Sequence, residues 1–205
     1  MKTKEIEISS RGSGIREALA ATEELASSAN LGKKETLRLR LLAEELFGMI
    51  RGITGEAEAL YWAEDTLRWM EKTELRFSLH MAVDTEMNKE MRRQLLGVST
   101  TGENAAVKGF MSRLMDVIST ALSPRDAETA DLLAVGMMNL GSTGSTADCI
   151  WSMQRYKDEV LALGDRDDAR ETWDELEKSI VAKLADEVRV YIRSGRVELV
   201  IDKSF

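Results

Sequence analysis

The sequence predicts an α+β protein, a two-layer sandwich in which helices cover one face of a mixed, mostly antiparallel sheet. Three observations lead to this class. Residues 74–84 alternate polar and apolar side chains, as a half-buried strand does. Residues 34–53 repeat apolar side chains at helical spacing, and two alternating runs within 188–201 flank a glycine-containing turn. We expect a single domain over residues 1–205, with a helical insertion at 122–187 before the C-terminal hairpin.

The N-terminal third predicts one short strand and two helices. Residues 5–9 alternate as a strand, and a turn follows in which Ser13 is the expected cap of a helix over 15–29. Asn30-Leu31-Gly32 then ends this helix with a residue type that suits a left-handed cap. The second helix then occupies 34–53.

The next segment predicts a strand at 57–63, a turn at 66–73 and the long strand at 74–84. The apolar residues of the long strand are expected on one face, and they are Leu75, Phe77, Leu79, Met81 and Val83.

Beyond residue 84 the pattern is mainly helical until the final hairpin. A charged helical turn at 86–96 leads into a polar loop, and a helix then runs from 105 to a stop at Ser123-Pro124. Further helical stretches are expected at 128–140, 150–163 and about 173–185.

The composition disfavours two classes of binding partner and indicates the cellular compartment. Lys and Arg number 28 against 36 Asp and Glu, and the resulting net charge of −8 disfavours binding to nucleic acid or to an anionic membrane. The single cysteine, Cys149, excludes an intramolecular disulfide and suits a reducing compartment. Because the N-terminus lacks the apolar run of a signal peptide, we expect a cytoplasmic protein.

A strand ending in Ser9-Ser10-Arg11, two helices and a strand pair resemble the histidine-kinase-like ATPase fold. The nearer resemblance is to its anti-sigma regulatory factor branch, whose members are serine/threonine kinases or switch proteins. It covers about residues 5–118 and the final hairpin. The resemblance implies an ATP or ADP site and a protein partner such as a sigma factor or an anti-anti-sigma-like protein.

In that family the second helix carries a glutamate base and, four residues on, an asparagine that holds Mg²⁺. The best register places Glu44 on the glutamate and Gly48 on the asparagine. Since glycine has no side-chain oxygen, a magnesium ion lacks its expected ligand here. The alternative is that Glu44 and Glu45 lie at the solvent edge of a packed helix.

Two further family motifs have counterparts. Asp84 ends the long strand, where the family places the aspartate that recognises adenine, although the two glycines of that motif are absent. The alternative for Asp84 is ordinary turn chemistry. Residues 99–110 resemble the phosphate-binding lid, and an ordinary capped helix start is the alternative there. The candidate phosphate contacts in this lid are Thr100, Gly102, Asn104, Lys108 and Gly109.

No metal site is predicted. His80, the only histidine, lies on the polar face of the long strand, and we expect a surface side chain rather than a phosphoacceptor. One histidine and Cys149 cannot supply a structural zinc site of the usual cysteine–histidine kind.

Three hypotheses follow. The first is a bacterial cytoplasmic regulator that binds ATP or ADP and phosphorylates or sequesters a protein, with Glu44 as the base. The second is a degenerate member of the same fold that acts as a protein-interaction module without turnover. The third is a dimerisation domain, with a homodimer formed through the insertion at 122–187.

Overall fold

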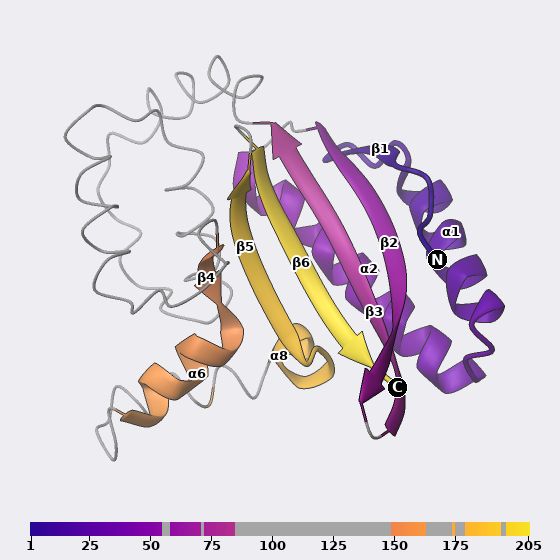
Figure 1. Cartoon of the computed structure of the whole chain (residues 1–205). Helices are drawn as coiled ribbons and strands as arrows, with labels where there is room; N and C mark the ends of the chain where they lie inside the picture. Colours follow the sequence, from indigo (N-terminus) through magenta and orange to yellow (C-terminus); the bar gives the residue numbers. More distant parts are fainter. Residues whose placement is uncertain (55–57, 71, 85–148, 163–173, 175–178, 194–195) are drawn as a thin grey trace.

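The N-terminal strand and the two helices after it form where the sequence predicts them. The computed structural model describes residues 1–54, 58–70, 72–84, 149–162, 174, 179–193 and 196–205 (Figure 1). In it β1 spans Ile6–Ser9, α1 spans Ile15–Ser28 and α2 spans Lys33–Thr54.

One antiparallel sheet organises the rest of the described chain. Its other strands are β2 (Glu58–Met70), β3 (Lys72–Asp84), β4 (Cys149–Ser152), β5 (Glu187–Arg193) and β6 (Arg196–Ser204). The order across the six-stranded sheet is β1-β2-β3-β6-β5-β4, and each described pair of strands is antiparallel. The predicted α+β class and the C-terminal hairpin are therefore confirmed.

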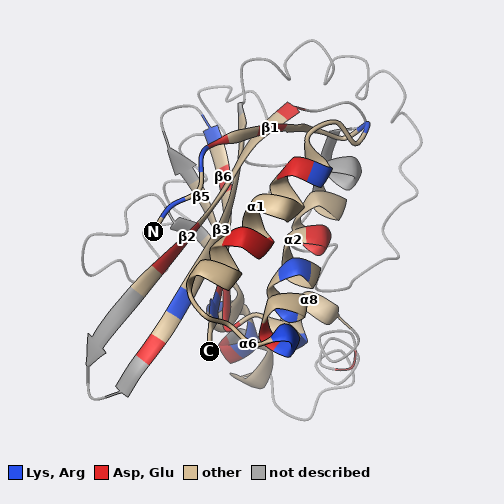
Figure 2. Ribbon diagram, turned by 90° about the vertical axis from the view of Figure 1, so that its right-hand side faces the viewer, with Lys and Arg blue, Asp and Glu red and all other residues tan. Residues whose placement is uncertain are grey.

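Helices α1, α2 and the short α8 (Ile180–Leu184) cover one face of this sheet, as Figures 1 and 2 show from two directions. Figure 2 also shows acidic and basic residues along α1 and α2. Helix α6 (Met153–Ala162) follows β4 at the far edge and adds three apolar side chains to the core, Met153, Tyr156 and Val160.

The core lies between the helices and the sheet. The predicted apolar face of β3 is confirmed, since Phe77, Leu79, Met81 and Val83 are fully buried and Leu75 packs partly buried against them. The largest fully buried side chains come from both layers, and they are Ile8, Leu25, Leu39, Leu42, Leu46, Tyr61, Phe77, Leu79 and Met81.

The end of α1 confirms the left-handed cap predicted within Asn30-Leu31-Gly32, since Asn30 adopts a φ of 58°. The Leu31 amide donates to the Ala26 carbonyl and the Asn30 amide to the Ser27 carbonyl, both at 3.0 Å. These are the two hydrogen bonds of a Schellman motif, and they satisfy carbonyls that the helix end leaves open.

The start of α1 differs from the prediction, because Gly14 and not Ser13 is its N-cap. Ser13 Oγ instead lies 2.8 Å from Ser9 Oγ, within the turn. Gly14 has a φ of 72°, and a Cβ there would come within 1.9 Å of the Glu7 carbonyl oxygen. The close approach of strand and turn therefore requires glycine at this position.

Two other predictions are wrong. Residues 66–73 do not form a turn, since β2 extends to Met70 and pairs with β3 up to Met70↔Lys72. Residues 150–163 are not helical throughout, because β4 precedes α6 and pairs with β5. In both places tertiary pairing overrides a weak local pattern. The predicted helices at 86–96, 105–122 and 128–140 lie outside the described residues.

Candidate functional site

The elements that carry Glu44 and Asp84 end at the same end of the sandwich. Helix α2 stops at Thr54, and β2 begins at Glu58 and pairs with the end of β3 through Ala59↔Val83. Asp84 is the last residue of β3 and lies opposite Arg196, the first residue of β6. The end of α2, the end of β3 and the start of β6 are therefore neighbours at the upper end in Figure 1.

Glu44 is held in an ion-pair network between α1 and α2. Its Oε1 lies 2.9 Å from Arg40 Nε, while Arg40 also contacts Glu23 of α1 at 2.5 Å. The Glu44 side chain is 39% exposed. The hydrogen bond to Glu23 is the largest cause that raises the pKa of Arg40, and the hydrogen bond to Glu44 is the next. The arginine therefore stays charged. Glu44 thus has a permanent cationic partner on the helix surface.

Gly48, one turn beyond Glu44, faces open space. It is exposed, and among the described residues a Cβ added there would meet no atom within 4 Å other than those of its own helix backbone. Packing therefore does not require glycine, and the position offers no metal ligand.

The remaining predicted site residues lie outside the part of the chain that the structure describes, and they are Thr100, Gly102, Asn104, Lys108 and Gly109. They come after Asp84, the last residue of β3, in the chain.

A second set of polar side chains lies on the open face of the sheet, opposite α1 and α2. His80 stacks on Trp62, with ring centroids 4.8 Å apart and planes at 9°, and Lys2 Nζ lies 4.8 Å from the centre of the Trp62 ring. His80 Nδ1 lies 2.8 Å from Glu198 Oε1, and Nε2 lies 3.4 Å from Glu64 Oε1. The His80 side chain is only 12% exposed, so the expected surface histidine is instead largely enclosed.

A buried carboxylate lies farther along the same face. Asp202 is 1% exposed. It accepts hydrogen bonds from Ser78 Oγ and Arg76 Nη2, both at 2.6 Å, and a third from Arg189. Burial lowers the pKa of Arg189, but the charges of Asp202, Tyr191 and Glu187 and the hydrogen bond to Asp202 together raise the pKa overall. Two arginines and a hydroxyl thus satisfy one buried carboxylate.

The sequence shows which residues lie on the polar side of each strand, but it does not show which strands are neighbours. Alternation places Arg76, Ser78 and His80 on the polar side of β3, and Glu198 and Asp202 on the polar side of β6. The contacts depend on which strands are neighbours, and β3 and β6 are separated by more than a hundred residues.

Comparison with protein-family models, with curated proteins and with solved structures gives no match for this chain. The resemblance described above therefore rests on its own residues and on the order of its elements. Within the described residues, no helix is both long and apolar enough to cross a membrane. Among those residues, no three His, Cys, Asp or Glu side chains form a group that could hold a metal ion.

Proposed function

We propose that the chain is a nucleotide-binding regulatory protein of the bacterial cytoplasm, which binds ATP or ADP and acts on a protein partner. The supporting observation is topological. Helix α2, which carries Glu44 near its middle, and strand β3, which ends at Asp84, stop at the same end of a helix-covered antiparallel sheet. The segment with the candidate phosphate contacts, residues 99–110, comes after Asp84 in the chain.

Within this proposal, the geometry on α2 favours binding without phosphoryl transfer. A general base needs a lone pair aimed at the reacting group, whereas Glu44 is paired with Arg40. Gly48 supplies no oxygen to position Mg²⁺. The partner, a sigma factor or an anti-anti-sigma-like protein, would then be sequestered according to the nucleotide state and not phosphorylated.

Nucleotide binding is tested by following thermal unfolding with ADP or ATP up to millimolar concentration, with Mg²⁺ or with EDTA. A ligand that binds the native state must raise its stability, so we expect a rise in Tm that persists in EDTA. Lys108→Ala should reduce the rise, and Lys183→Ala, on the exposed side of α8, is the matched control. Equal stabilisation of both variants would refute the lid assignment.

Catalysis is tested separately with ATP labelled on its terminal phosphate. We expect neither release of label nor its transfer to protein, in wild type and in Glu44→Gln alike. Turnover by wild type that Glu44→Gln abolishes would instead support the kinase hypothesis, with the Glu44–Arg40 pair opening on substrate binding.

A further inference from the structure

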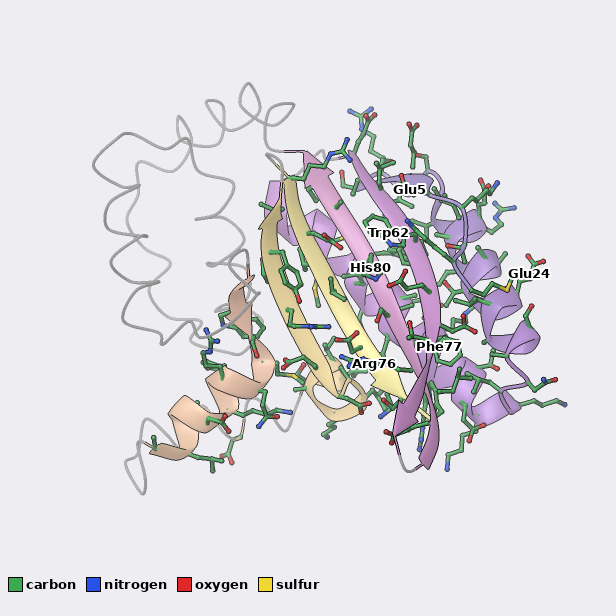
Figure 3. The ribbon with its side chains drawn as sticks, in the orientation of Figure 1. Glu5, Glu24, Trp62, Arg76, Phe77 and His80 are labelled. Carbon is green, nitrogen blue, oxygen red and sulfur yellow. The ribbon has the colours of Figure 1, made fainter. Side chains whose placement is uncertain are left out.

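Three side chains on the open face form a diagonal across adjacent strands. Glu64 on β2 lies opposite Ser78, two residues before His80 on β3, and Glu198 on β6 lies opposite Ala82, two residues after it. A carboxylate therefore approaches the imidazole from each side. Figure 3 shows His80 next to Trp62 on the face of the sheet turned away from α1 and α2.

Glu198 fixes the orientation of the ring. Its Oε1 lies 2.8 Å from His80 Nδ1, which is the distance of a charge-assisted hydrogen bond. Glu198 itself is 7% exposed, and the stacked Trp62 holds the plane of the ring. With the Nδ1 hydrogen donated to Glu198, Nε2 presents its lone pair. This is the arrangement of a metal-binding histidine, whose other nitrogen donates to a carboxylate.

The other ring nitrogen of His80, Nε2, lies near the carboxylate of Glu64 on β2. The Nε2 atom is buried and has no hydrogen-bond partner among the residues that the structure describes, and Glu64 Oε1 lies 3.4 Å away. A charge-assisted N–H···O⁻ bond would draw the two atoms to about 2.7–2.9 Å. Two ligands of one tetrahedral ion, each at about 2.0–2.1 Å, lie about 3.4 Å apart. The separation thus fits two donors that share a metal ion.

We propose that His80 Nε2 and Glu64 bind one divalent transition-metal ion, with zinc preferred, and that Glu198 is a positioning residue for the imidazole. Two carboxylates flank the imidazole, one from each neighbouring strand, and a divalent ion would offset their negative charge. A nitrogen–oxygen donor pair suits zinc and its neighbours rather than the hard cations Mg²⁺ and Ca²⁺. Glu64 is 38% exposed, so solvent can reach the site and supply the remaining ligands.

The test uses the fact that the chain has a single histidine, so that imidazole NMR signals belong to His80 alone. Zinc chloride is titrated into the untagged chain, with magnesium chloride in parallel. We expect the His80 signals to shift and saturate at one zinc per chain, with no response to magnesium. Glu64→Gln should weaken zinc binding, and Glu198→Gln should weaken it about 10–100-fold.

Glu45→Gln, a partly exposed carboxylate on α2, is the matched control and should bind zinc as wild type does. Circular dichroism and the urea midpoint of each variant show that it is folded. His80 signals that do not move at a tenfold excess of zinc would overturn the proposal. An affinity unchanged by Glu64→Gln would also overturn it, and a bridging proton would then account for the geometry.

Discussion

The two faces of the sheet bury their side chains by different means. Toward α1, α2 and α8, β3 presents Phe77 and Leu79, which are fully buried in apolar contacts. Away from the helices the same strand presents Ser78 and His80, which are held by carboxylates from β6. Burial of the apolar face stabilises the fold in proportion to the apolar area removed from water, whichever apolar side chains cover it. The polar face depends on particular partners, because each buried polar group left unpaired costs free energy.

The largest effect is expected on the covered face. Phe77→Ala removes a fully buried ring that packs edge-on against Phe205 at 5.9 Å, and should lower the free energy of unfolding by about 3–5 kcal/mol. Chemical denaturation measures this change. The exposed Glu74→Ala on the same strand is the control and should stay within about 0.5 kcal/mol. A loss below 1 kcal/mol or so for Phe77→Ala would mean that this face is not tightly packed.

The second largest loss of stability is expected from a substitution on the open face. Asp202→Ala leaves Arg76 and Arg189 without their shared carboxylate and should cost about 2–4 kcal/mol. This is below the value for fully buried pairs, because the two arginines are 29% and 30% exposed. Adding Arg189→Met to Asp202→Ala should restore part of the loss, since it removes one stranded charge. Additive losses in this double-mutant cycle would contradict a network that depends on pairing.

A smaller loss of stability is expected from breaking a buried polar contact between α1 and β2. The Tyr61 hydroxyl lies 2.6 Å from Thr22 Oγ1, which in turn donates to the Ala18 carbonyl at 2.8 Å. Burial raises the pKa of Tyr61, which keeps the phenol neutral. Tyr61→Phe should cost about 1 kcal/mol in denaturation, because Thr22 keeps its other partner. A loss as large as that of Phe77→Ala would show that polar pairing also dominates this layer.

The smallest effect concerns α2, whose two sides differ as the sheet faces do. Gly48 faces open space, so Gly48→Ala should stabilise the chain by about 0.5–1 kcal/mol through helix propensity. Gly14→Ala is the contrasting variant and should destabilise it, because Gly14 has a positive φ and touches the backbone of Glu7. Destabilisation by Gly48→Ala would mean that the glycine has a contact outside the described residues.

Local patterns predicted the covered face well and the open face poorly. Alternation located β3 and its buried residues, and Asn30 marked the end of α1, because these features are encoded within a few residues. The length of β2 was not predictable, since Asp65 and Thr66 interrupt the apolar pattern while their backbone pairs with β3. The polar contacts of the open face require the pairing of β3 with β6, which no local pattern contains.

For the candidate nucleotide site, the sequence predicted which elements carry the described residues but not the contacts of their side chains. Glu44 and Gly48 lie on the expected helix, and Asp84 ends the expected strand. The ion pair between Glu44 and Arg40 depends on side-chain geometry at the α1–α2 surface, where Glu23 also contributes.

Isothermal titration of the chain with ADP in EDTA, for wild type and Asp84→Asn side by side, tests the proposed function most directly. If the chain binds nucleotide as proposed, we expect saturable binding of one ADP per wild-type chain and clearly weaker binding by Asp84→Asn. Both proteins should be equally stable without nucleotide. Absence of binding by wild type at millimolar ADP, or equal affinity of the two proteins, would contradict the proposal.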